Sequence, residues 1–71
     1  MKEYRISIRM KNFDTTTEYY KTMKKCLKVL KEELLLLYYI QDEILAIEID
    51  TLENYIITNV KVLKGKEFTI S

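Results

Sequence analysis

The stretch Leu34-Leu35-Leu36-Leu37-Tyr38-Tyr39-Ile40 places seven consecutive apolar residues in the middle of a chain of 71 residues. A helix or strand in so small a domain buries one side at most, so a run of this length carries apolar side chains to the opposite side as well. A contiguous apolar patch on a protein surface is typical of an interaction site. The run therefore predicts a partner, either a second copy of the chain or another protein.

The residues before this run have the pattern of one amphipathic helix. Apolar residues recur at steps of three and four and form a single stripe: Tyr20, Met23, Leu27, Leu30, Leu34 and Leu37. The sequence Thr15-Thr16-Thr17-Glu18 has the spacing of a capping box, with Asp14 as a competing cap, so the helix is predicted to begin near residue 15. No glycine or asparagine marks its end, which is predicted near Leu37, and residues 38–40 are left open between helix and strand.

Strand patterns stand on both sides of the helix. Residues Tyr4 to Met10 alternate between apolar and polar, which is the period of a half-buried strand. Three more strands are predicted at Glu43–Asp50, Tyr55–Leu63 and Lys66–Ile70, joined by a hairpin loop at residues 51–54 and a tight turn at Lys64-Gly65. The order β-α-β-β-β predicts an α+β fold in one domain, residues 1–71, with a single helix packed on one face of a small, mostly antiparallel sheet.

The crossing helix makes the first two strands parallel in this prediction, with the third strand between them and antiparallel to both. Alternation in residues 43–50 puts Leu45, Ile47 and Ile49 on one face of the sheet, and Ile44 and Ala46 on the other. The open face is then partly apolar and is expected to contribute to a dimer surface. Adjacent tyrosines cannot both point inward, so the apolar run contributes as well. The predicted partner or oligomer interface comprises Leu35, Leu36, Tyr38, Tyr39 and Ile44.

A second predicted surface is basic. With 100° per residue, five lysines fall within about 120° of the helix circumference, beside the apolar stripe. They are Lys21, Lys24, Lys25, Lys28 and Lys31. They are interpreted either as contacts for phosphates or for an acidic protein surface, or as a solvated flank whose stems cover the edge of the core. The stripe holds no arginine and no interleaved aromatic residue for base recognition. Nucleic-acid binding is therefore the alternative hypothesis.

The chain has few groups for catalysis or metal binding. It contains no histidine and one cysteine, Cys26, so a nucleophile–base pair has almost no parts and no intrachain disulfide can form. Glu48 and Asp50 are interpreted as structural carboxylates rather than ligands of Mg²⁺. Cys26 is interpreted as a small packing residue. The sequence predicts a protein that is not an enzyme and holds no metal or cofactor.

Size and composition give the remaining expectations. The charged, alternating N-terminus is unlike a signal peptide, and seven apolar residues fall short of the roughly 20 that a membrane helix needs. With a single cysteine, this pattern predicts a cytoplasmic location without membrane contact. Domains below about 70–80 residues commonly need a disulfide, a metal or a partner chain for stability, which favours a homodimer.

The chain is similar in size, in absence of catalytic groups and in its AT-rich-genome composition to compact phage inhibitors, including anti-CRISPR proteins. This is a likeness of class that no motif carries. The predicted function is that of a small, dimeric, non-enzymatic inhibitor that binds a larger protein.

Overall fold

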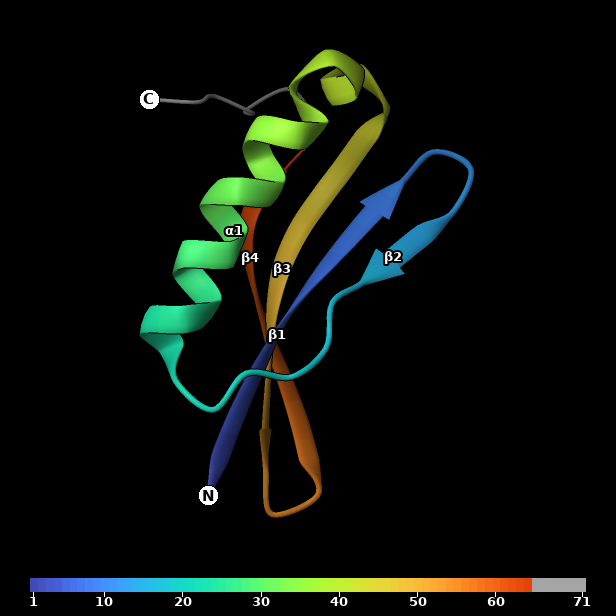
Figure 1. Ribbon diagram of the computed structural model, residues 1–71. Coiled ribbons are helices and arrows are strands. Elements are labelled where there is room, and N and C mark those ends of the chain that lie inside the picture. The colour runs from blue at the N-terminus through green and yellow to red at the C-terminus, as the bar shows by residue number, and fades with distance from the viewer. Residues whose placement is uncertain (65–71) are drawn as a thin grey trace.

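The computed structural model describes residues 1–64, in which one helix packs against a four-stranded antiparallel sheet (Figure 1). The predicted α+β fold with a single helix is therefore confirmed. The strands are β1 (Lys2–Met10), β2 (Asp14–Thr16), β3 (Ile44–Glu53) and β4 (Ile56–Lys64). Helix α1 (Met23–Leu37) continues into the 3-10 helix η1 (Tyr38–Glu43). The predicted last strand, residues 66–70, and the turn at Gly65 lie outside the described residues.

The strand order is β2-β1-β3-β4, and each neighbouring pair is antiparallel. The prediction that the first two long strands are parallel, with another strand between them, is wrong. β1 and β3 are direct neighbours, with Ile6 opposite Ile49 and Ile8 opposite Ile47. The chain makes one more reversal than predicted, at residues 11–13, and this reversal changes the relative direction of the two strands.

The extra reversal comes from the three threonines at residues 15–17. β-Branched residues favour extended backbone, and here the edge of β1 offers them a partner. Thr15 lies opposite Ile8 in the β1–β2 ladder. The Thr17 N–H donates to the Ile6 carbonyl at 2.9 Å, and the Ile6 N–H donates to the Thr17 hydroxyl oxygen at 2.9 Å. The segment predicted as the first helical turn therefore extends the sheet.

Helix α1 begins two turns later than predicted. Its N-cap is Thr22, whose hydroxyl oxygen accepts a hydrogen bond from the Lys25 N–H at 3.2 Å. The capping box predicted at Thr15 and Glu18 is wrong, because residue 15 is already committed to β2. The predicted end at Leu37 is confirmed, and the following residues tighten into η1.

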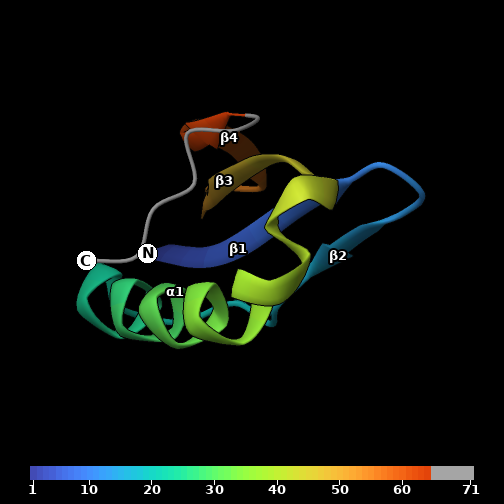
Figure 2. The ribbon, with the colours of Figure 1, turned by 90° about the horizontal axis from the view of Figure 1, so that it is seen from above.

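The core lies between α1 and the face of the sheet that α1 covers, which we call the inner face. It consists of Ile6, Ile8, Met10, Cys26, Leu30, Ile44, Ile47 and Ile49. Seen from above, α1 lies beside β1, whereas β4 forms the edge of the sheet farthest from the helix (Figure 2). Among the residues that the structure describes, α1 therefore covers the inner face of β1 more than that of β4.

A bulge in β3 decides which of its side chains reach the core. Met10 lies opposite Ile44 and Arg9 opposite Ala46, so Leu45 is the extra residue between two pairs. The bulge shifts the alternation, and Ile44 enters the core with 3% of its surface exposed while Leu45 is half exposed. The predicted faces of Ile44 and Leu45 are wrong for this reason.

The β3–β4 hairpin closes more tightly than predicted. Its turn consists of Asn54 and Tyr55, both with positive φ (52° and 65°), the signature of a two-residue turn that matches the twist of the strands. Both strands therefore reach the turn, and residues 51–53, predicted as loop, belong to β3. In Figure 1 the hairpin extends below the first turn of α1, at the end of the molecule opposite η1.

Candidate interaction surfaces

The central apolar run is divided between the core and the molecular surface. Leu34, Leu37 and Ile40 pack against the core. The other four residues are exposed and form what we call the helix-end patch: Leu35, Leu36, Tyr38 and Tyr39. Leu36 is 65% exposed and Tyr39 is 84% exposed. The described chain therefore leaves the outer half of the run uncovered, as the helical period requires.

Ile44, predicted to belong to the same interface, lies elsewhere. It is buried on the inner face of β3 opposite Met10. The other four predicted interface residues are all exposed and lie in the last turn of α1 and in η1, whereas Ile44 is buried.

The predicted lysine stripe is exposed but shorter on the helix than expected. Lys21 precedes the N-cap, so four lysines lie on α1: Lys24, Lys25, Lys28 and Lys31. None of the ion pairs found within residues 1–64 involves any of the five lysines. At 100° per residue, Lys24, Lys28 and Lys31 fall opposite the buried Cys26 and Leu30. They form a row on the outer side of α1.

The lysine row leads directly into the helix-end patch. Leu35 follows Lys31 by four residues and Lys28 by seven, so it continues the same side of the helix. Glu32 is the one acidic residue of α1 near this side, four residues after Lys28. The lysine row and Leu35, the first residue of the helix-end patch, thus lie on the same outer side of α1.

The face of the sheet away from α1, the outer face, carries two ion pairs that the sequence pattern did not reveal. Glu48 and Asp50 are 2% and 4% exposed. The Arg5 Nε–H donates to the Asp50 Oδ2 at 2.8 Å, and the Arg9 Nε–H donates to the Glu48 Oε1. The carboxylates are covered by the arginine side chains that cross them from β1.

The surroundings of these arginines stabilise their charged forms. The hydrogen bond that Arg5 donates to Asp50 raises the pKa of Arg5, and the hydrogen bond that Arg9 donates to Glu48 raises the pKa of Arg9. The Arg5 guanidinium also lies 4.8 Å from the centre of the Tyr19 ring, a cation–π distance. These groups are engaged with one another, and no group of three or more potential metal ligands occurs within residues 1–64.

Cys26 lies in the core with no exposed surface, on the side of α1 that faces the sheet. Burial raises the pKa of its thiol, because the thiolate would lose its hydration. The thiol is therefore poorly placed to act as a nucleophile.

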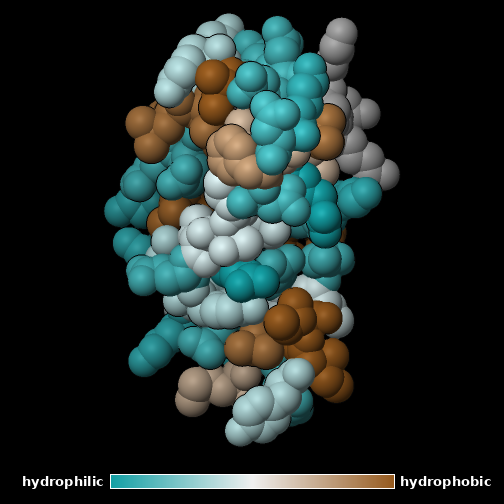
Figure 3. All heavy atoms as spheres, turned by 90° about the vertical axis from the view of Figure 1, so that its right-hand side faces the viewer, coloured by the Kyte–Doolittle hydropathy of each residue, from teal (hydrophilic) through white to brown (hydrophobic). Residues whose placement is uncertain are grey.

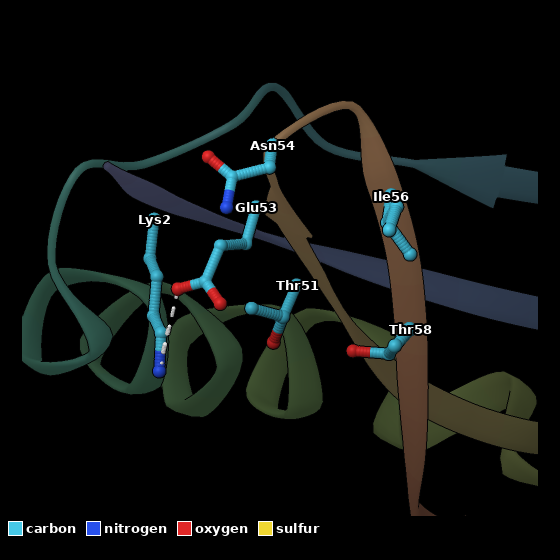
Figure 4. A pocket seen from close by; sticks show the side chains of 6 residues that line it. All are labelled: Lys2, Thr51, Glu53, Asn54, Ile56 and Thr58. Carbon is cyan, nitrogen blue, oxygen red and sulfur yellow. Dashed lines mark ion pairs between the residues drawn. The ribbon is translucent and has the colours of Figure 1, made fainter.

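A shallow hollow of about 220 Å³ lies beside the hairpin (Figure 4). It is lined by Lys2, Thr51, Glu53, Asn54, Ile56 and Thr58. Within it the Lys2 Nζ and the Glu53 Oε2 are 3.6 Å apart, and both side chains are about half exposed. Figure 4 shows Ile56 and Thr58 on β4, across from this ion pair.

No helix within residues 1–64 is long and apolar enough to cross a membrane. No family model, curated protein or solved structure matches this chain.

Proposed function

We propose that the protein is a non-enzymatic protein–protein interaction module that binds a larger protein through the helix-end patch. The observation that carries this proposal is the exposure of four large apolar side chains within five positions of the chain, Leu35, Leu36, Tyr38 and Tyr39. Such a cluster is unfavourable in water, and covering it with a partner recovers about 1.5–3 kcal/mol for each fully buried leucine. Tyrosine adds contact area with few rotatable bonds and is enriched among the residues that dominate binding energy.

The lysine row gives the partner a chemical character. Lys24, Lys28 and Lys31 lie on the same outer side of α1 as Leu35, without ion-pair partners within the described chain. A binding surface with an apolar depression next to acidic residues would match both parts. Complementary charge of this kind mainly raises the rate of association and selects among partners.

We propose further that the protein acts in the cytoplasm as a homodimer and works by occupying a functional surface of its target. Its size and its lack of histidine support an inhibitor of the compact phage type, to which anti-CRISPR proteins belong. This part of the proposal rests on likeness of class.

Affinity capture with matched variants tests the proposal. The wild-type chain, the Leu36→Ala/Tyr39→Ala variant and a Leu45→Ala control would be used as baits, and the captured proteins identified by mass spectrometry. Leu45 is an exposed leucine outside the patch. We expect one protein to be retained by wild type and control and lost with the patch variant. Equal retention by all three baits would refute binding through the patch.

Nucleic-acid binding through the lysine row is the second candidate. It is favoured by the absence of any ion pair to these lysines within residues 1–64. Binding to duplex DNA and RNA would be measured at about 50 and 200 mM salt, because phosphate contacts weaken steeply over this range. Changing Lys24, Lys28 and Lys31 to Glu should abolish binding without unfolding the protein. No binding at the lower salt concentration removes this candidate.

A further inference from the structure

The two edges of the sheet are very different. β2 contributes only Asp14–Thr16, three exposed residues of polar character. β4 contributes nine residues and, within residues 1–64, has β3 as its only neighbour. Short, polar edges resist pairing with other chains, whereas long edges with apolar side chains invite it.

The side chains of β4 are apolar on both faces of the sheet. Val60 lies opposite Ile49 on the inner face and is 68% exposed, and Ile56 on the same face is 65% exposed. Ile57 lies on the outer face and is half exposed. Figure 3 shows apolar side chains gathered at the lower end of the molecule, where Figure 1 places the β3–β4 hairpin. Within residues 1–64, the β4 edge therefore combines backbone that no second strand pairs with apolar side chains that are largely exposed.

We propose that β4 pairs antiparallel with β4 of a second copy of this chain, about a two-fold axis through Thr58, to form a continuous eight-stranded sheet. The proposal specifies the dimer interface of the function proposed above. It leaves the helix-end patch, which lies on α1 and η1, free for a target.

The register follows from symmetry and from the bulge in β4. A two-fold axis perpendicular to a sheet keeps each side chain on its own face. Because side chains alternate between the faces along a strand, two directly opposed residues must have residue numbers that are the same or differ by an even number. Regular pairing of β4 with β3 extends from Ile56 to Lys61 and is interrupted before Leu63. An axis at Thr58 uses this regular segment and sets Ile56 opposite the partner's Val60.

Other registers are less favourable. An axis at Lys61 places two lysines directly opposite one another, which is destabilising. An axis at Asn59 places Ile57 opposite the partner's Lys61, and an axis at Val60 requires pairing across the bulge. With the axis at Thr58, the inner face gains two β-branched apolar pairs on either side of a Thr–Thr pair, combinations that favour cross-strand pairing.

The extent of the interface sets the expected affinity. The five paired residues 56–60 span about 17 Å of strand, so the contact is smaller than the roughly 800 Å² per partner of a standard interface. We therefore expect a dissociation constant in the micromolar range. Sedimentation equilibrium from low micromolar to near-millimolar protein would detect it.

Cysteine substitution tests the register. Residues on the axis have Cα atoms about 4.5–5.5 Å apart, within disulfide range, so Thr58→Cys should give a covalent dimer under mild oxidation. In Val60→Cys the two cysteines are four residues out of register, about 13 Å apart, and should cross-link only when mixed with Ile56→Cys. The wild-type chain, whose Cys26 is fully buried, is the blank.

Charge substitution tests the interface without covalent chemistry. Thr58→Lys and Thr58→Asp should each raise the dimer dissociation constant about tenfold or more, and an equimolar mixture of the two should associate again. Leu36→Ala/Tyr39→Ala should leave the dimer intact, so loss of target binding and loss of dimerisation are separable. A wild-type chain that stays monomeric throughout, dimers unaffected by Thr58→Lys, or equal cross-linking of Thr58→Cys and Val60→Cys alone would overturn the proposal.

Discussion

Replacing Arg5 with methionine removes one partner of the ion pair that buries Asp50. The Arg5 side chain is 28% exposed and the Asp50 side chain is 6% exposed, and the bond between them measures 2.8 Å. Methionine keeps the packing volume of the stem but leaves the carboxylate on the sheet without its cation. The free energy of unfolding should therefore fall.

The size of the loss follows from the burial of the two groups. Breaking a fully buried pair from one side costs about 3–5 kcal/mol, because a charge remains without compensation. Arg5 is partly exposed, so water can reach Asp50 once the arginine is gone, and we expect the lower value of about 2–3 kcal/mol. A domain of this length has a total stability of roughly 4–10 kcal/mol, so the loss is a large share of it.

Urea unfolding followed by circular dichroism would measure this loss. With an m-value of about 1 kcal/mol/M, the midpoint should fall by about 2–3 M. The matched control is Lys2→Met, which removes a cation from the half-exposed pair with Glu53 at 3.6 Å. That exposed pair should contribute no more than about 0.5 kcal/mol.

A double-mutant cycle separates the ion pair from the contact of Arg5 with Tyr19. Asp50→Leu combined with Arg5→Met removes both charges and should recover stability to within about 1 kcal/mol of wild type. The reasoning is refuted if Arg5→Met costs no more than Lys2→Met, or if the two substitutions at residues 5 and 50 are simply additive.

Three further predictions concern the core, the helix cap and the thiol. Ile47→Ala should cost about 2–5 kcal/mol in urea unfolding because its side chain is fully buried, while Leu45→Ala on the bulge should cost under about 1 kcal/mol; similar losses would contradict the observed bulge. Thr22→Ala should cost about 1 kcal/mol and lower helical circular dichroism, whereas Thr15→Ala should leave helicity unchanged. Cys26 should react with a thiol reagent only as fast as the protein opens. Because its folded-state pKa is raised, stability should fall as pH rises above about 9, and a Cys26→Ala variant should lack that part of the fall. Fast labelling of the native protein at neutral pH would contradict the burial.

The placement of the candidate surface was largely accessible from the sequence. Leu35, Leu36, Tyr38 and Tyr39 were expected outside because a helix with one buried side cannot hide seven consecutive apolar residues. Ile44 was misplaced because strict alternation was assumed across residues 44 and 45, where the strand bulges. No local signal marks that bulge, since it depends on how β3 meets Met10 at the end of β1.

The buried carboxylates illustrate the same limit. Glu48 and Asp50 alternate with isoleucines, so they read as the solvated side of a strand. Their burial depends on Arg5 and Arg9 arriving from β1, which required the antiparallel register that was not predicted. The alternating pattern of β1 and the β-branched character of β4 were visible in the sequence, but the pairing between strands was not.

By itself the sequence determined the α+β class, the single helix ending at Leu37, the inward side of β1 and the exposure of the outer half of the apolar run. These features follow from periodicity along one segment, which adjacent residues fix through backbone geometry. Only the tertiary structure decided that residues 14–16 join the sheet, that β1 and β3 are antiparallel and that Ile44 replaces Leu45 in the core. Each of these outcomes depends on hydrogen-bond partners and packing supplied by residues distant in the chain, and such partners exist only once the strands have met.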